Sequence, residues 1–196
     1  MILRRLVATV LLTVVLIQPE TVITQYNQKS SEDYLWEILL EEAPNEYVAA
    51  GILGYFWRES KYRSDAIPNW PRVQAASEYD PCAAMTEQLD AADKEEFVAL
   101  VQQTGGYGLG QWYDESYLES LYDFCRGAGA SVADARMQCR FTVHICTTTP
   151  RIWDTLKDAT SALEAGRIIG CLHDGSPRGA ETIAAKADAI YQERCG

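Results

Sequence analysis

Histidine and basic side chains are scarce in this 196-residue chain. It has two histidines, His144 and His173, and its cysteines include no C-x-x-C pair, so the usual ligand set of a structural zinc site is absent and we expect no metal. Lysine and arginine number 17 against 28 acidic residues, which gives a net charge of −11. That balance excludes the basic surface that nucleic-acid binding requires. No G-K-[ST] phosphate loop occurs, and we expect no cofactor.

Alternating apolar and polar patterns, typical of strands, are also missing. Apolar residues instead recur at helical spacing in several segments, with capping residues such as Asn45, Asp90, Asp114 and Ser131 before them. Residues 31–196 are therefore predicted to form one all-α domain, with room for a small β-hairpin in the proline-containing stretch from Lys61 to Pro81. A domain of this size buries a sufficient core alone, and we expect a monomer.

The N-terminus contains the one long apolar run. Arg4 and Arg5 precede an apolar stretch from Leu6 to Ile17. Twelve residues are short for a membrane span and typical of a signal-peptide core. No A-x-A cleavage site follows, so residues 1–24 are interpreted as a signal peptide or an uncleaved membrane anchor, and residues 25–30 as a linker.

Six cysteines fit an exported chain. An even number of cysteines in an oxidising compartment predicts up to three disulfides, with 15 pairings open. Cys139 and Cys146 are seven residues apart on one predicted helix face, so each would need a partner elsewhere. Free cysteines in the core are the alternative.

The first candidate site residue is Glu59, at the end of the predicted helix EYVAAGILGYFWRES from Glu46 to Ser60. Tyr55 lies one turn earlier on the same face. Partial burial and the negative end of the helix dipole both favour a protonated carboxyl group there. A protonated acid near neutral pH is what glycosidic cleavage requires. A surface glutamate paired with a neighbouring base would look the same in sequence.

The second candidate is the glycine-rich segment TGGYGLGQW, from Thr104 to Trp112. Glycines let a backbone approach a ligand closely, and Tyr107, Gln111 and Trp112 supply a hydroxyl, an amide and a ring. Such groups suit an N-acetylated sugar, although a tight turn between helices is the alternative. The aromatic residues that follow, Tyr113 to Phe124, are interpreted mainly as core.

The two motifs, AAGILGYFWRESKYRSDAI and GGYGLGQW, lie about fifty residues apart. In that order they resemble the phage tail-tip lysozyme family, within the lysozyme-like superfamily of peptidoglycan hydrolases. The resemblance covers about Glu32 to Ile145. It implies a lysozyme-like helical fold and peptidoglycan glycan strands as the binding partner.

The resemblance also implies the roles of individual residues. Glu59 would be the catalytic acid and Ser60 would help to orient it. The loop would line the sugar cleft through Tyr107, Gly108, Gln111 and Trp112. The six cysteines, and the segment Tyr113 to Ser116 after the loop, depart from the family pattern.

A second carboxylate would separate the mechanisms. Asp65 and Asp114 are the first candidates because they stand closest to the two motifs, although each also fits a helix cap or a solvated charge. A muramidase that hydrolyses the bond between N-acetylmuramic acid and N-acetylglucosamine needs such a partner. A lytic transglycosylase needs none, since the sugar's own 6-hydroxyl attacks. The sequence favours the muramidase slightly.

Two further function classes stay open. A lysozyme-like scaffold of a phage tail, conjugation apparatus or surface assembly would bind wall glycan without cutting it, and the charge of −11 agrees with that. A cysteine peptidase would use Cys82, at the start of a helix predicted after Asp80-Pro81, with His144 or His173.

Overall fold

The computed structural model describes residues 31–77, 79–173 and 176–196. Within those ranges the chain forms helices joined by loops and one isolated β-bridge, so the domain is all-α as predicted. The helices are α2 (Glu32–Glu42), α3 (Glu46–Ser60), α4 (Trp70–Ala75), α5 (Pro81–Ala91), α6 (Lys94–Thr104), α7 (Glu115–Gly127), α8 (Ala135–Thr148), α9 (Pro150–Leu156), α10 (Ala162–His173) and α11 (Pro177–Cys195).

Side-chain caps set where most of these helices begin. Asn45 accepts the backbone N–H of Val48 at 3.0 Å and starts α3 where the sequence predicts it. Two other predicted caps are wrong by three residues. Asp93 rather than Asp90 caps α6, and Asp134 rather than Ser131 caps α8. In each case an aspartate nearer the first turn is available, and its carboxylate accepts a backbone N–H there.

The predicted β-hairpin between Lys61 and Pro81 does not form in the described part of this segment. Helix α4 occupies its middle instead, after Asn69 in the left-handed backbone conformation. The two-residue bridge that does occur pairs Tyr107 with Trp112, inside the glycine-rich loop.

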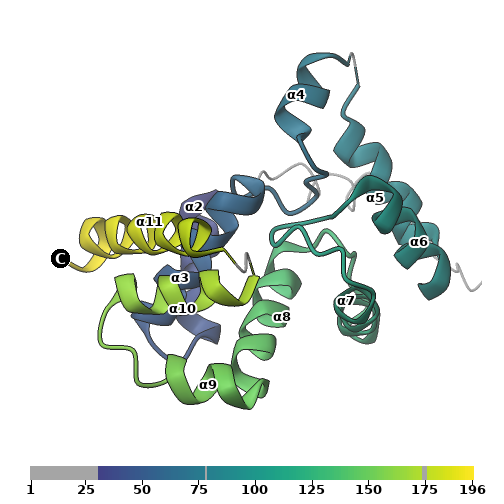
Figure 1. The fold of residues 1–196 in the computed structure, drawn as a ribbon. Coiled ribbons are helices and arrows are strands. Elements are labelled where there is room, and N and C mark those ends of the chain that lie inside the picture. Colours follow the sequence, from purple (N-terminus) through teal and green to yellow (C-terminus); the bar gives the residue numbers. More distant parts are fainter. Residues whose placement is uncertain (1–30, 78, 174–175) are drawn as a thin grey trace, which may run out of the picture.

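Figure 1 shows the helices in two groups, with α2, α3 and α8–α11 on one side and α4–α7 on the other. Contacts of α7 with α8 join the groups, and α4 projects from the second group at the top of the view. The loop after α3 and the glycine-rich loop both cross between the two groups. The candidate site residues lie on these crossing segments or at the helix ends next to them, Glu59 and Ser60 at the end of α3 and Asp114 at the start of α7.

Helices α3, α10 and α11 pack on one another in the first group. Glycines permit this close approach. A Cβ at Gly54 would lie 2.8 Å from the carbonyl oxygen of Ile183 and 3.1 Å from the backbone nitrogen of Ala187, both in α11. A Cβ at Gly166 of α10 would meet Ala184 and Ala187 at 2.9 and 2.8 Å. The glycines of the AAGILG motif thus serve helix packing.

The predicted disulfides are wrong. All six cysteines belong to the described residues and none is bonded. Cys82, Cys125, Cys139 and Cys146 are buried, and burial raises the pKa of Cys125 and of Cys146 to about 12. These thiols therefore serve as small apolar core residues.

The two exposed cysteines stand far apart for a geometric reason. Cys171 is near the end of α10, and Cys195 ends α11. Since α11 begins only a few residues after α10 and runs for 19 residues, Cys195 is roughly 27 Å along the helix from its start. A disulfide needs Cα atoms within about 7 Å.

No helix among the described residues is long and apolar enough to cross a membrane. The expected signal or anchor, residues 1–24, and the expected linker, residues 25–30, lie outside the described residues.

Replacing Gly54 by alanine is expected to destabilise the fold by about 1–3 kcal/mol, because the added methyl group meets backbone atoms of α11 that cannot move away cheaply. Chemical denaturation measures this free energy of unfolding. Gly127→Ala is the matched control, since nothing lies within 4 Å of its Cβ position. Equal stability of Gly54→Ala and wild type would contradict the close packing of α3.

Candidate functional site

Glu59 is in the last turn of α3, and its side chain is 28% exposed. Its Oε1 lies 3.5 Å from Nε of Arg58. The chain then reverses sharply, because Lys61 and Tyr62 both adopt the left-handed conformation, with φ of 55° and 68°. Tyr62 donates its hydroxyl hydrogen to Glu32 of α2 at 2.5 Å, which holds this turn in place. Glu59 is therefore a half-buried carboxyl group at a fixed helix end.

Tyr55 joins this helix end to the glycine-rich loop. Its hydroxyl group donates to the carbonyl oxygen of Gly110 at 2.6 Å, and its side chain is 2% exposed. Burial and the negative charge of Glu59 raise the pKa of Tyr55 well above its usual value. The Tyr55 hydroxyl thus stays protonated, within electrostatic range of Glu59, and it fixes the distance between α3 and the loop.

His173, at the end of α10, stacks its imidazole ring on the ring of Tyr55. Its ring is 4.2 Å from the Tyr55 ring, centroid to centroid, with 17° between the planes. Burial lowers the pKa of His173 to about 4. Its Nε2 atom is buried and has no hydrogen-bond partner among the residues that the structure describes. Three elements, α3, the glycine-rich loop and α10, therefore meet at Tyr55.

The glycine-rich loop is mostly buried. Tyr107 is fully buried, and its hydroxyl group shares a hydrogen bond of 2.5 Å with Thr86. Trp112 is 3% exposed and packs edge-on against Phe141. These two side chains, expected to contact sugar, instead face the core, because the Tyr107–Trp112 bridge turns both inward.

Gln111 and Gly108 hold the loop against the segment that follows α3. Gln111 donates from Nε2 to the carbonyl oxygens of Ala66, at 2.9 Å, and Gly108, at 3.0 Å. The backbone N–H of Gly108 also donates to Ala66, at 2.9 Å. Gln111 remains half-exposed, and Tyr113 beyond the loop is 65% exposed. The ring that faces solvent here is thus Tyr113, which the sequence placed in the core.

Gln138 of α8 is the buried residue on which both segments rest. Its Oε1 accepts the backbone N–H of Leu109 at 2.7 Å. Its Nε2 donates to the carbonyl oxygens of Ser64, at 2.8 Å, and Val132, at 2.6 Å. One fully buried amide therefore ties the loop after Glu59 to the glycine-rich loop.

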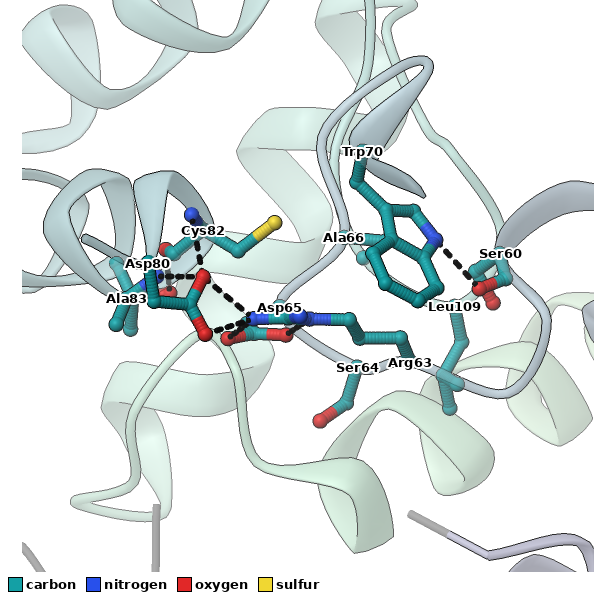
Figure 2. A network of polar contacts seen from close by, with 12 residues as sticks. Ser60, Arg63, Ser64, Asp65, Ala66, Trp70, Asp80, Cys82, Ala83 and Leu109 are labelled. Carbon is teal, nitrogen blue, oxygen red and sulfur yellow. Dashed lines mark hydrogen bonds and ion pairs between the residues drawn. The ribbon is translucent and has the colours of Figure 1, made fainter. Parts of the chain in front are cut away.

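Asp65 is part of an ionic network centred on Arg63 (Figure 2). Arg63 donates to Asp65 at 2.5 and 3.0 Å and to Asp80 at 2.6 and 2.8 Å. Burial opposes ionisation of Asp80, but Arg63 outweighs it and lowers the pKa of Asp80 below its usual value. Asp80 also accepts the N–H of Cys82 and so caps α5. The network fastens α5 to the loop after Glu59.

Trp70 and Ser60 complete this side of the site, as Figure 2 shows. The Trp70 ring lies 4.9 Å from the Arg63 guanidinium, and its Nε1 donates to the carbonyl oxygen of Ser60 at 3.0 Å. The Ser60 hydroxyl group donates back to Phe56 at 3.1 Å, and its side chain is fully buried. Ser60 therefore anchors α4 through its backbone carbonyl group.

Asp114 is the N-cap of α7 and accepts from the backbone N–H and the hydroxyl group of Ser116, at 3.0 and 2.6 Å. These hydrogen bonds lower the pKa of Asp114. Both candidates for a second carboxylate thus have structural partners, Arg63 for Asp65 and the start of α7 for Asp114.

The cysteine peptidase alternative loses its support. Cys82 does stand at the start of α5, but its side chain is fully buried and burial raises its pKa. A nucleophilic thiol needs the opposite. Among the described residues no cluster of three or more His, Cys, Asp or Glu side chains is arranged to hold a metal ion.

Sequence reasoning missed Gln138, Arg63 and Trp70. A polar residue between the apolar Met137 and Cys139 marks Gln138 as a residue that needs buried partners, but not which ones. The spacing of Arg63 and Asp65 suggests an ion pair, whereas Asp80 joins it only in three dimensions.

His173 should make stability depend on pH. The unfolded chain takes up a proton near the usual histidine value of 6.5, and the buried ring only near 4, so stability is lost as the pH falls from about 6.5 to about 4. The slope is at most about 1.4 kcal/mol per pH unit. His173→Phe should flatten this part of the curve in denaturant titrations. His144→Phe, at an exposed position, is the control; an unchanged slope in His173→Phe would contradict the prediction.

Comparison with known proteins gives one match. A family model described as phage tail lysozyme matches residues 30–193. No curated protein and no solved structure matches the chain.

Proposed function

Because this chain belongs to the phage tail lysozyme family, we propose that Glu59 is the general acid that cleaves the glycan strands of peptidoglycan. Membership makes the chain a peptidoglycan-cleaving enzyme, either a glycosidase or a lytic transglycosylase. Its substrate lies outside the cytoplasm, and so does its action. The bond cleaved is proposed to be the one between N-acetylmuramic acid and N-acetylglucosamine.

The position of Glu59 carries this proposal. The carboxyl group stands at the end of a helix that glycine packing holds against α10 and α11, beside a turn held by Tyr62. Tyr55 places the glycine-rich loop next to it. A general acid must keep such a fixed position relative to the glycosidic oxygen while retaining access to substrate. The held helix end supports the first condition, and the 28% exposure of the Glu59 side chain supports the second.

The glycine-rich loop is proposed to contact sugar mainly through Gln111 and Tyr113, which are exposed at least in part. An exposed ring can stack on the apolar face of a sugar. Tyr107, Gly108 and Trp112 then act indirectly, as the buried support of the loop. Ser60 acts in the same way on the helix end.

Hydrolysis and transglycosylation differ in what attacks after Glu59 protonates the glycosidic oxygen. In a muramidase, water attacks with help from a second carboxylate. The sequence favours this reaction, with Asp65 or Asp114 as partner. One observation favours the transglycosylase as second candidate, since Arg63 engages Asp65 and Asp114 caps α7. In that reaction the 6-hydroxyl group of the muramic acid attacks and an anhydro product results.

Glu59→Gln is expected to lower the rate of peptidoglycan cleavage at least about 100-fold, because the amide cannot donate the proton. Release of soluble glycan from purified sacculi by the full-length protein measures the rate. Glu37→Gln, an exposed glutamate on α2, is the matched control and should leave the rate unchanged. Wild-type activity in Glu59→Gln would remove Glu59 from the catalytic role.

The products identify the reaction. Mass spectrometry of the released fragments should show either reducing N-acetylmuramic acid ends or anhydro ends lighter by one water. With reducing ends, Asp65→Asn or Asp114→Asn should abolish activity without unfolding the protein. With anhydro ends, both variants should keep activity to the extent that they fold, which circular dichroism monitors.

Export is proposed to depend on residues 1–24 as a signal peptide or membrane anchor. The intact mass of the exported protein distinguishes them. Loss of about the first 24 residues indicates cleavage, whereas an intact Met1 in the membrane fraction indicates an anchor. A protein retained in the cytoplasm would contradict both.

A further inference from the structure

A groove between α3 and α11 lies apart from Glu59. It is lined by Trp57, Arg178, Glu181, Thr182, Ala185 and Lys186. Trp57 precedes Glu59 by two residues, so their side chains leave α3 about 200° apart. The groove is therefore on the opposite side of the helix from the candidate acid.

Cations gather around the Trp57 ring. The ammonium nitrogen of Lys61 lies 3.8 Å from the ring centroid, and that of Lys186 lies 5.7 Å from it. Lys186 is paired with Glu32, and Glu181 in the groove wall is paired with Arg167. Lys61 and Arg178 make no ion pair with any residue that the structure describes, and both are exposed.

This charge distribution is unusual for the chain. Most cations of the described segments pair with a carboxylate, as expected at a net charge of −11. Burial and the positive charges of Arg58 and Lys186 lower the pKa of Lys61, although Glu59 acts in the opposite sense. Lys61 and Arg178, which pair with no carboxylate among the described residues, thus stand beside a half-exposed aromatic ring, where an anion can bind.

We propose that this groove binds the stem peptide of peptidoglycan, with a free peptide carboxylate paired to Lys61 and Arg178 and the apolar part of the fragment against Trp57. The inference rests on the proposed function for its choice of ligand. Peptidoglycan stems carry free carboxylates, and a carboxylate between an ammonium and a guanidinium group makes charge-assisted hydrogen bonds.

The groove also answers an electrostatic difficulty. A chain of charge −11 is repelled by an anionic wall. A local cationic site that pairs with one wall carboxylate holds the enzyme on its substrate despite that net repulsion. Because the groove and Glu59 occupy opposite sides of α3, the stem bound in the groove can belong to a different strand from the one that is cleaved.

The test uses isothermal titration calorimetry with the full-length protein and a disaccharide–tetrapeptide in which N-acetylmuramic acid is the reducing sugar. The bond from C1 of muramic acid, which is the one cleaved, is therefore absent from this fragment. Lys61→Asn combined with Arg178→Gln should weaken binding about tenfold or more. Arg151→Gln combined with Lys157→Gln changes the net charge equally at exposed positions around α9 and should leave affinity unchanged. Asparagine at position 61 tolerates the left-handed backbone.

Two further arms separate the chemistry from its alternatives. A fragment with amidated carboxylates should bind the wild type weakly, and its affinity should be the same for the charge variant. Trp57→Leu should lower the affinity for both fragments. Unchanged affinity of the charge variant for the carboxylate fragment overturns the proposal. Glycerol phosphate serves as a phosphate probe. If the charge variant lost only its binding of glycerol phosphate and kept its affinity for the carboxylate fragment, the proposal would also be overturned, because the groove would then bind a phosphate polymer.

The outcome is independent of the catalytic assignment. Glu59→Gln should bind the fragment in the groove as the wild type does, whether or not Glu59 is the acid. Conversely, Arg178→Gln alone, on α11, should cleave uncross-linked glycan normally and cross-linked sacculi more slowly. Failure of Glu59→Gln to lose activity would therefore leave the groove proposal standing.

Discussion

The buried amide of Gln138 is the interaction on which the candidate site depends. It satisfies the backbone of Leu109, Ser64 and Val132 at once, in the core where water is not available to replace it. Because an unpaired buried polar group costs roughly 1–3 kcal/mol, the loops have little freedom to leave this arrangement separately. The hydrogen bonds of Gln138 thus help to set the position of the glycine-rich loop relative to the end of α3.

Two different kinds of contact act together around this amide. Helix α3 is held by close packing through Gly54 and its neighbours, which is insensitive to salt and pH. The loop beyond it is held by Arg63, whose two carboxylate partners come from different segments. Tyr55 connects the two kinds of contact, because its ring is in the packed helix and its hydroxyl group binds the loop. Glu59 stands at the boundary between them.

The sequence predicts the helices well and the burial of loop side chains poorly. Helix α3 has a cap, an apolar face and a clear end, all of which are local properties. Tyr107 and Trp112 look like binding residues because they stand among glycines, yet a backbone bridge within the same loop turns both inward. A glycine-rich loop can direct its side chains either way, and the contacts of Tyr107 with Thr86 and of Leu109 with Gln138 act with the bridge to hold the inward-facing arrangement.

The prediction of disulfides is wrong and the ionic network is not predicted, for related reasons. Export suggests disulfides, but pairing requires proximity and suitable geometry, and the four buried thiols, on α5, α7 and α8, are all free. Asp65 is a candidate catalytic partner because it follows Glu59 closely in the sequence. In the structure its carboxylate pairs with Arg63, whose Nε lies 2.5 Å from Oδ1 of Asp65. Sequence distance to a motif is thus a weak guide to chemistry when a charged residue of opposite sign lies between.

The packing of α3 against α10 and α11 has a consequence for the order in which the protein matures. Helix α3, residues 46–60, packs on α10 and α11, which are synthesised more than one hundred residues later. Contacts of such long sequence separation form late and slow the search for the native state. During synthesis the part of α3 that packs on α10 and α11 therefore stays uncovered until these two helices have emerged. The helix that carries Glu59 is thus packed on both of these partners only after residues 162–195 have been synthesised.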